Sequence, residues 1–293
     1  MAKIIDGKAI AAEIKQELKE RTIAFEEMFG FRPGLAVVLI GTDPASRVYV
    51  NNKRKACEEI GYNSFVYELS ADTSEADLLE LVWQLNNRDD VHGILVQLPL
   101  PKHINEDKVI NTISPKKDVD SFHPQNVGKL MLGEPCFMPC TPAGVMELLK
   151  RSNIDITGKE CVIVGRSNIV GKPMAILLLQ ANGTVTVCHS KTKDLKEVCR
   201  RADILVVAIG KPKFITADMV KEGAVVIDVG INRVDGKLCG DIDFDNVKEV
   251  ASAITPVPGS CGPMTVAMLM QNTFEAALYA ALKTSDKDFT YNI

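Results

Sequence analysis

The sequence is poor in aromatic residues and in side chains that bind metals. Aromatic residues make up 5% of the 293 residues, with one tryptophan, and only four histidines are present. The histidines and the eight cysteines lack the clustered spacing of zinc ligands, so we predict no metal site. The cysteines form no Cys-x-x-Cys pair and lie in apolar segments, so we expect reduced, mostly buried thiols.

An excess of positive charge and long hydrophobic runs are also missing. The formal net charge is −4, and no stretch interleaves Lys or Arg with aromatic residues, which argues against a nucleic-acid surface. The longest strongly apolar stretches, such as residues 204–209, fall far short of the roughly 20 residues that span a bilayer. The first residues carry neither a signal-peptide nor a transit-peptide pattern. We therefore predict a cytoplasmic protein that binds neither nucleic acid nor membranes.

The chain has instead the composition of a large globular protein. A hydrophobic share of 46% with 25% charged residues can form a full core, and the length suits two domains. Runs rich in Val and Ile alternate with helical patterns, which predicts the α/β class with mainly parallel sheets. The first series has helices at residues 8–27, 44–60 and 75–86 and strands at 35–40, 65–69 and 93–98.

A change of domain is predicted in residues 116–141, which are rich in Pro, Gly, Asp and Asn and have no sustained period. Thr141 is the expected N-cap of a helix with Pro142 at its first position. The second series has a helix to 151, strands at 160–164, 184–188, 203–208 and 224–229, and helices at 169–180, 195–200 and 263–283. We predict one domain at residues 1–138 with 272–293 and another at 139–271, with a polar tail after Thr284 that frays.

One strand-to-helix segment has the pattern of a Rossmann dinucleotide site. A short apolar strand precedes Gly165, and the glycine turn leads into the predicted helix at 169–180, where small residues and free N–H groups suit a pyrophosphate. Ser167 replaces the second glycine of the usual Gly-x-Gly-x-x-Gly motif. An ordinary strand-to-helix turn therefore stays open as an alternative.

The residues near this turn favour NADP over NAD. NAD enzymes keep an acidic residue about twenty residues after the glycine turn, but this chain has His189-Ser190-Lys191-Thr192 there. Arg166 follows the first glycine, so a cation and hydroxyl donors surround the position of a 2′-phosphate. A solvated surface charge is the alternative interpretation of Arg166.

In the first series, a helix with Asp43 as its expected N-cap and Pro44 at its first position follows strand 35–40. Tyr49 and Lys53 are four residues apart, which predicts that both lie on one face of this helix, beyond the end of the strand. An aromatic face and an amine would then point into one ligand site. The alternative is a lysine whose stem lies along a half-buried tyrosine.

Further polar groups follow the third strand of this series. Gln97 ends an otherwise apolar run, and its amide needs a polar partner, which is either a ligand or loop backbone. Asp118 and Asp120 add two carboxylates in a loop, where ordinary solvation is the alternative. The Pro- and Gly-rich segment 255–265 is equally compatible with a purely structural loop between a strand and a helix and with a wall beside a nicotinamide.

Together these segments closely resemble one enzyme family. The motifs are Ile5-Asp-Gly-Lys8, Pro44-Ala-Ser-x-x-Tyr49-Val-x-x-Lys53-x-Lys-Ala-Cys57, Gly93-x-Leu-Val-Gln97-Leu-Pro-Leu-Pro101, Lys117-Asp-Val-Asp120, Gly165-Arg-Ser-x-Ile-Val-Gly171-x-Pro-Met174 and Pro256-Val-Pro-Gly259-x-x-Gly-Pro-Met-Thr265. In order and spacing, from about residue 3 to 283, they resemble the bifunctional methylenetetrahydrofolate dehydrogenase/methenyltetrahydrofolate cyclohydrolase family.

The resemblance implies two α/β domains, the first folate-binding and catalytic, the second a Rossmann-type NADP-binding domain, with a cleft between them. It implies that 5,10-methylenetetrahydrofolate gives a hydride to NADP⁺ and that water then opens the methenyl product to 10-formyltetrahydrofolate. The protein would be a homodimer with a small-molecule folate substrate. By resemblance, the cofactor-binding residues are Gly165, Arg166, Ser167, Ser190 and Ile231.

The resemblance also implies roles for the residues of the first domain. Lys53 would be the principal acid–base group of the hydrolysis, with Gln97 hydrogen-bonded to it. Asp120 would hold the amino and ring N–H groups of the pterin, and Tyr49 would stack on the aminobenzoyl part of the folate.

Three residues depart from the family pattern, and three other functions compete with it. Ser121 replaces a glycine, and Ser260-Cys261 stand where Gly-Val is more common; we expect all three near the folate, and a side chain at 260 could alter a backbone that glycine allows. The competing functions are a monofunctional dehydrogenase of the same fold, an NADP-dependent dehydrogenase of a small hydroxy acid, and a nucleotide-binding sensor. The hydroxy-acid enzyme leaves Tyr49, Gln97 and Asp120 unexplained.

Overall fold

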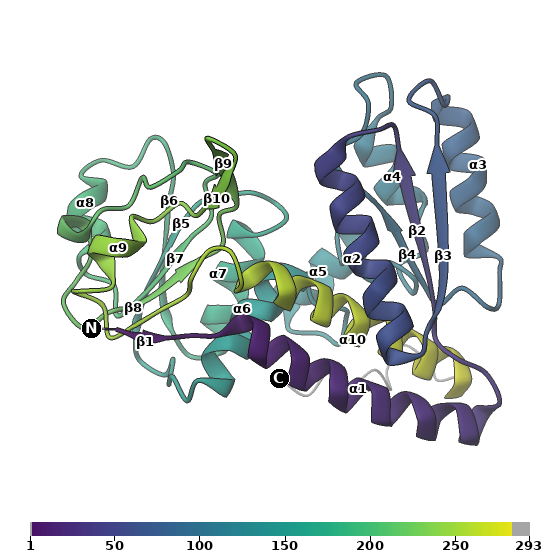
Figure 1. Ribbon diagram of the computed structural model, residues 1–293, viewed down its shortest axis with the longest axis horizontal. Helices are drawn as coiled ribbons and strands as arrows, with labels where there is room; N and C mark the ends of the chain where they lie inside the picture. Colours follow the sequence, from purple (N-terminus) through teal and green to yellow (C-terminus); the bar gives the residue numbers. More distant parts are fainter. Residues whose placement is uncertain (1, 283–293) are drawn as a thin grey trace. The chain divides into compact units, whose positions relative to one another are not determined.

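The computed structural model describes residues 2–282, which form two compact units. The N-terminal unit holds Ala12–Cys140 and residues 266–282, and the C-terminal unit holds residues 2–11 and Thr141–Thr265. The helices α1 (Gly7–Phe29) and α10 (Cys261–Leu282) each contribute residues to both units (Figure 1). This division differs from the predicted domains because residues 2–11 belong to the C-terminal unit and α10 leaves that unit after Thr265 rather than at residue 272.

The N-terminal unit is built on a three-stranded parallel sheet in the order β3-β2-β4. Its strands are β2 (Gly34–Ile40), β3 (Asn63–Leu69) and β4 (Gly93–Val96). Every residue of the central strand β2 is buried, which explains its unbroken apolar sequence. Its neighbours along the chain are α2 (Pro44–Ile60), α3 (Glu75–Asn86), α4 (Glu106–Thr112) and α5 (Pro124–Leu132).

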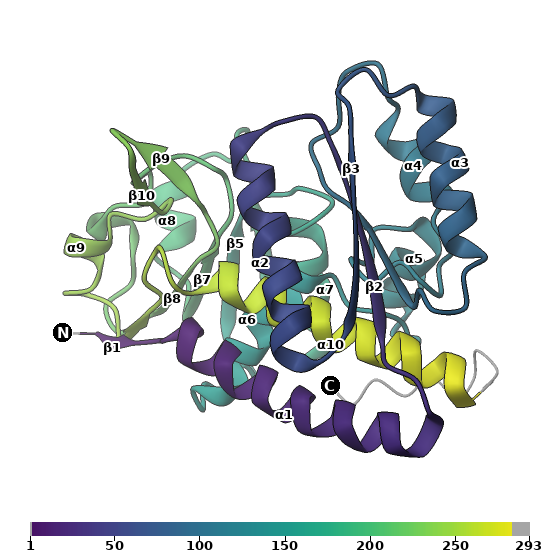
Figure 2. The same ribbon diagram turned by 45° about the vertical axis from the view of Figure 1, so that its right-hand side comes forward.

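Helices pack on this sheet through alternate residues of β2. Ala36, Val38 and Ile40 form one cluster with α3 and α4, and α2 packs against β2 and β3. On the same unit α1 and α10 lie side by side, as Figure 2 shows. Arg21 of α1 donates to the carboxylate of Glu275 in α10 at 2.8 Å.

The C-terminal unit contains a six-stranded, entirely parallel sheet in the order β1-β11-β8-β7-β5-β6. The strands are β1 (Lys3–Ile4), β5 (Glu160–Val164), β6 (Thr184–Cys188), β7 (Ile204–Val207), β8 (Val225–Asp228) and β11 (Ala253–Ile254). Its helices are α6 (Cys140–Arg151), α7 (Gly171–Gln180), α8 (Leu195–Cys199) and α9 (Phe244–Val247), with the 3-10 turn η1 (Ala217–Met219). A small antiparallel ribbon pairs β9 (Asn232–Val234) with β10 (Lys237–Cys239).

Most predicted strands and long helices are confirmed, but several boundaries are wrong. Thr141 is not an N-cap, because α6 begins at Cys140 and the Thr141 hydroxyl pairs with that of Thr265 at 2.9 Å. The segment predicted as loop contains α5, and the first strand β1 was not expected. The Asp43 N-cap is confirmed, since its carboxylate accepts the N–H of Ser46 at 2.8 Å. The predicted fraying of the tail after Thr284 lies outside the described residues.

The cysteines are free thiols, as expected, and seven of the eight are buried. In residues 2–282, no helix is both long and apolar enough to cross a membrane. The same part of the chain holds no group of three or more His, Cys, Asp or Glu side chains arranged to bind a metal ion.

Candidate active site

The N-terminal unit brings two predicted residues together where its strand order reverses. The chain places β3 on one side of β2 and β4 on the other, so the carboxyl ends of β2 and β4 flank the crevice where such sheets bind ligands. Gln97 directly follows β4, and α2 follows β2 after a tight turn capped by Asp43. The topology therefore carries residues of α2 to the same edge as Gln97.

Lys53 and Gln97 form the centre of this site. Lys53 lies on the buried stripe of α2, is only 8% exposed, and donates from Nζ to Gln97 Oε1 at 2.8 Å. The Gln97 Nε2 group donates to the Leu98 carbonyl at 2.8 Å. Because that second bond fixes which end of the amide is the donor, the acceptor oxygen must face the lysine.

The buried position changes the charge preference of Lys53. Burial lowers the pKa of Lys53 below its usual value, because the ammonium loses its water, and the Asp120 carboxyl and Cys140 thiol offset part of that effect. Burial likewise raises the pKa of Asp120, and Lys53 opposes this shift. Lys53 therefore has easier access to the neutral amine than a surface lysine does.

The two predicted loop carboxylates have different environments. Asp118 is buried and accepts the backbone N–H groups of Phe122 at 3.2 Å and His123 at 2.8 Å, as well as the Asn126 amide at 2.9 Å. Among the described residues, the partners of the Asp120 carboxyl are the Cys140 thiol, which bonds to it, and Lys53, which interacts with it electrostatically; no backbone donor is among them. Asp118 thus holds the loop, whereas Asp120 has no backbone partner of this kind.

Tyr49 differs from Lys53 in its exposure to solvent. It lies one turn before Lys53 on α2, and its side chain is 38% exposed whereas Lys53 is buried. The expectation that the ring and the amine share one ligand site stays a prediction.

Asp120 lines a narrow recess of about 20 Å³ in the same unit, whose other walls are mostly apolar side chains such as Leu98 and Phe122.

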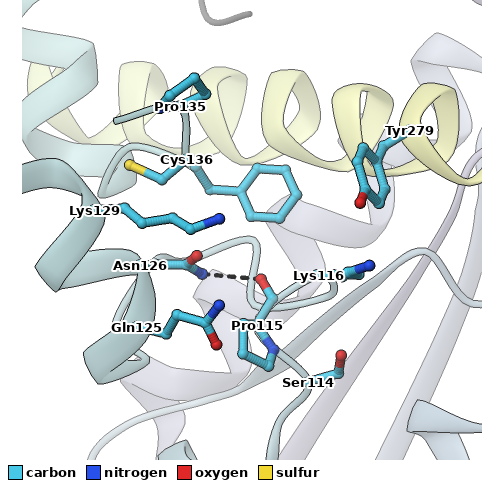
Figure 3. A pocket seen from close by; sticks show the side chains of 10 residues that line it. Ser114, Pro115, Lys116, Gln125, Asn126, Lys129, Pro135, Cys136 and Tyr279 are labelled. Carbon is cyan, nitrogen blue, oxygen red and sulfur yellow. Dashed lines mark hydrogen bonds between the residues drawn. The ribbon is translucent and has the colours of Figure 1, made fainter. Parts of the chain in front are cut away.

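A larger pocket of the same unit lies away from these residues. It has a volume of about 160 Å³, is lined by Lys129, Phe137 and Tyr279 among others, and includes neither Lys53 nor Asp120 (Figure 3). Nothing in the sequence pattern indicated this pocket. Sequence reasoning also missed Cys140 as a neighbour of Lys53, since a lone cysteine beside a helix start carries no signal of its own.

In the C-terminal unit, the glycine turn lies at the equivalent point of the sheet. Strand β5 has β6 on one side and β7 on the other, so the strand order reverses between β5 and β7. Gly165 follows β5 with φ of 134°, and a Cβ there would lie 2.3 Å from the Ala208 carbonyl oxygen. A Cβ at Gly171 would lie 2.3 Å from the Gly165 carbonyl oxygen. Both positions therefore require glycine.

The remaining predicted cofactor residues surround this turn. The Ser167 hydroxyl accepts the N–H groups of Val170 at 3.2 Å and Gly171 at 3.3 Å, which explains why α7 begins at Gly171 rather than at 169. Arg166 and Ser190 are exposed, Ser190 two residues after β6 ends. Ile231 follows β8 and exposes 43% of its side chain.

The departures from the family pattern lie in different surroundings. Ser121 is buried, adopts a φ of 61°, and donates its hydroxyl to the Phe137 carbonyl at 2.5 Å. Ser260 is also buried, and it is absent from the positive-φ residues. The Cys261 thiol donates to the Asp228 carbonyl at 3.3 Å, so it is bound within the C-terminal unit.

Comparison with known proteins identifies this class of enzyme. Residues 5–120 match the tetrahydrofolate dehydrogenase/cyclohydrolase catalytic domain, and residues 139–281 match the NAD(P)-binding domain of the same family. The chain therefore belongs to the tetrahydrofolate dehydrogenase/cyclohydrolase family.

Individual relatives cover nearly the whole chain. The bifunctional protein FolD of Acetivibrio thermocellus is 64% identical over 286 residues, which are 96% of this chain and 99% of the relative. The crystal structure of the bifunctional FolD dehydrogenase/cyclohydrolase of Campylobacter jejuni is 54% identical, with a TM-score of 0.93 over 95% of this chain and 99% of that one. The Trypanosoma brucei enzyme, solved with NADP cofactor and an inhibitor, is 40% identical, with a TM-score of 0.92 over 97% and 99% of the two chains.

Proposed function

We propose that the chain catalyses both reactions of its family: the NADP-dependent oxidation of 5,10-methylenetetrahydrofolate to the methenyl compound and its hydrolysis to 10-formyltetrahydrofolate. The observation that carries the proposal is the buried Lys53 bound to Gln97. A dehydrogenase alone needs bound cofactor and substrate, but it has no need of a desolvated amine. Hydrolysis of a methenyl group needs a base for the attacking water.

Lys53 is suited to move that proton. The neutral amine, which burial favours, accepts a proton from water as the water oxygen bonds to the methenyl carbon. The resulting ammonium then donates a proton to N5 as the bond between that nitrogen and the carbon breaks, and the remaining hydroxyl proton is released to water as the formyl C=O bond forms. Gln97 accepts a hydrogen bond from Nζ in the structure and so orients the amine. The lysine ends the cycle in its starting form.

Asp120 and Tyr49 are assigned to binding the folate. No backbone donor is among the partners of the Asp120 carboxylate in the described residues, so it can accept hydrogen bonds from the N–H groups of a pterin. Such bonds favour the ionised carboxylate and oppose the pKa increase that burial causes at Asp120. The partly exposed Tyr49 ring is available to stack on the aminobenzoyl group.

The C-terminal unit fits NADP. Gly165 and Gly171 allow the tight backbone packing of the turn that leads into α7, and a helix N-terminus of this kind suits a pyrophosphate. Arg166 and Ser190 are exposed donors, and no acidic residue occupies positions 189–193 to oppose a 2′-phosphate. Ile231 offers an exposed apolar surface to the nicotinamide ring. When bound, NADP⁺ supplies the hydride acceptor; the protein supplies only its position.

We also propose a cytoplasmic homodimer, on the family resemblance. Light scattering after gel filtration measures the mass in solution, and a mass of one chain at micromolar concentration would contradict the dimer. The monomer mass to compare is 32.0 kDa.

The purified chain tests the function directly. It should reduce NADP⁺ with 5,10-methylenetetrahydrofolate, with a lower KM than for NAD⁺, and should hydrolyse supplied methenyltetrahydrofolate faster than buffer does. Oxidation without hydrolysis would support the monofunctional dehydrogenase. Binding of NADPH without turnover of any folate would support the sensor.

A further inference from the structure

Two buried aspartates in the C-terminal unit have no part in the functions assigned above. Asp228 is the last residue of β8, and Asp241 follows the β9–β10 ribbon. Asp241 is fully buried and Asp228 is 3% exposed. Acidic side chains are rarely buried to this degree unless specific partners hold them, so their partners indicate their role.

Asp241 binds three consecutive backbone N–H groups. Its Oδ2 accepts from Ile209 at 2.7 Å and Gly210 at 2.9 Å, and its Oδ1 accepts from Lys211 at 2.8 Å. Oδ1 also accepts the Asn232 side-chain amide at 2.8 Å. Hydrogen bonds to an ionised acceptor are about twice as strong as neutral ones, so this carboxylate holds the loop 209–211 firmly.

The groups that Asp241 holds flank the cofactor turn. The loop 209–211 begins two residues after β7, and the preceding Ala208 carbonyl lies against Gly165 at the point where the strand order reverses. Asn232 directly follows Ile231, the residue assigned to the nicotinamide. One carboxylate thus joins two backbone segments that border the proposed cofactor site.

Asp228 in turn holds Asp241. It accepts the N–H groups of Gly230, Asp241 and Ile242, each at 3.0 Å. A Cβ at Gly230 would lie 2.2 Å from Asp241 Cγ, and a Cβ at Gly240 would lie 1.9 Å from Asp228 Oδ2. The two glycines therefore let both carboxylates reach the backbone, and Gly230 immediately precedes Ile231.

We propose that Asp241, held in place by Asp228, is a positioning residue that fixes the loop 209–211 and Ile231 for NADP binding. The proposal rests on the proposed function. The arrangement also has a consequence for the phosphates: three consecutive N–H groups form an anion-binding concavity, and here Asp241 fills it. The phosphates are left to the glycine turn at Gly165.

The test compares two Asp→Asn variants of the same unit. Asp241→Asn keeps the size of the side chain but places an NH₂ group where a backbone N–H needs an acceptor. Asp203→Asn is the matched control, because Asp203 also accepts a backbone N–H, from Glu160 at 3.0 Å, and binds Lys221 at 2.7 Å. It directly precedes β7 and so lies at the amino ends of the strands, opposite the cofactor turn. Each variant loses one negative charge and one acceptor.

We expect Asp241→Asn to weaken NADP⁺ binding about tenfold, because leaving a buried donor unpaired has an effect of that order. Asp203→Asn should change it less than about twofold, and hydrolysis of supplied methenyltetrahydrofolate should be unchanged in both. The measurements are calorimetric titration with NADP⁺ and the KM and kcat of each step. Equal NADP⁺ affinity in the two variants would overturn the proposal, whether both fall or neither does.

A milder variant covers the case in which Asp241→Asn does not fold. Asn232→Ala removes only the link between Asp241 and the residue after Ile231, and should raise the Kd for NADP⁺ about threefold with the loop bonds intact. An unchanged Kd contradicts the coupling to Ile231. Failure of the unaltered chain to bind NADP⁺ would instead refute the proposed function, so the two failures are distinguishable.

Discussion

The two units share a reversal of strand order but use it for different kinds of chemistry. Each has a parallel sheet whose strand order reverses, between β2 and β4 in one and between β5 and β7 in the other, and each carries its candidate site at the carboxyl ends there. In the N-terminal unit the site pairs the buried Lys53 with the half-buried Gln97. In the C-terminal unit it is a backbone turn with exposed side chains, Arg166 and Ser190.

The difference follows from what each ligand requires. Proton transfer by Lys53 near neutral pH is favoured by its loss of water, because desolvation lowers the pKa of the ammonium and so brings the amine toward neutrality. A dinucleotide already carries its charge and reactive ring, so its site needs accessible donors and a backbone that can come close. The reversal of strand order thus determines where each candidate site lies, and the degree of burial of its side chains determines which chemistry it can carry out.

The sharpest test of this contrast is Lys53→Met. We expect loss of hydrolysis by at least about 100-fold, since general acid–base groups contribute that much or more. Binding of NADP⁺ should stay within about twofold, because the C-terminal unit has its own sheet and core.

Lys55→Met is the control, because Lys55 lies on the same helix but is exposed. It should leave hydrolysis unchanged. Retention of full methenyltetrahydrofolate hydrolysis by Lys53→Met would refute the assignment of the lysine.

Arg166→Ala tests the C-terminal unit in the same way, because it should impair NADP⁺ binding and spare hydrolysis. We expect the KM for NADP⁺ to rise about tenfold and the KM for NAD⁺ to change little, because only NADP⁺ carries the 2′-phosphate that a charged hydrogen bond can hold. Hydrolysis of supplied methenyltetrahydrofolate should be unaffected.

Lys172→Ala is the matched control, since Lys172 is an exposed cation of the same turn that donates to Asn168 Oδ1 at 2.7 Å. A KM that rises equally for NADP⁺ and NAD⁺ in Arg166→Ala would refute the preference for NADP.

The role of burial at Lys53 is tested by Gln97→Glu. The new carboxylate would lie 2.8 Å from Nζ in place of the amide oxygen, and an adjacent negative charge raises the pKa of Lys53. In the proposed mechanism hydrolysis starts from the neutral amine, so its rate should rise with pH through that pKa. The rising limb of the pH–rate profile should therefore move to higher pH, by about one unit or more.

Gln97→Met removes the hydrogen-bond acceptor without adding charge and is the control. It should not move the rising limb of the pH–rate profile to higher pH. An unmoved or lowered limb in Gln97→Glu would show that Lys53 does not act through its neutral form.

Much of this fold could be predicted from local pattern. The unbroken apolar run of β2 and the glycine turn after β5 carry strong signals, because a strand buried on both faces must be apolar throughout and a crowded turn tolerates only glycine. The strand β1 has only two residues, and α5 has nine. A strand of two residues has no period to detect, and the Pro, Gly, Asp and Asn content of residues 116–141 favours a loop where α5 forms.

The sequence indicated which residues to consider for the candidate site, but not which of them are hydrogen-bonded to one another. Lys53 and Gln97 are 44 residues apart, so only the fold shows that they are hydrogen-bonded. Asp118 and Asp120 look alike in the sequence; they differ because backbone donors of the following turn reach Asp118. Asp241 gave no signal, since its partners are backbone N–H groups, which every sequence has.

The smallest expected effect concerns the two buried serines that replace glycine, one in each unit. Ser121→Gly relieves a positive φ, worth about 1–2 kcal/mol, but loses a hydrogen bond of about 1 kcal/mol and adds about 0.4–1 kcal/mol of unfolded-state entropy. The free energy of unfolding should therefore stay within about 1 kcal/mol of the original.

Ser260 has no positive φ to relieve, so Ser260→Gly should destabilise the C-terminal unit by about 0.4–1 kcal/mol through the added entropy, with no compensating gain. Thermal unfolding of both variants without ligands, followed by calorimetry, measures the difference. If Ser121→Gly lowers the melting temperature more than Ser260→Gly does, then the hydroxyl bond to Phe137 outweighs the backbone strain. The serine at 121 would in that case stabilise the Asp120 loop more than the glycine usual in this family.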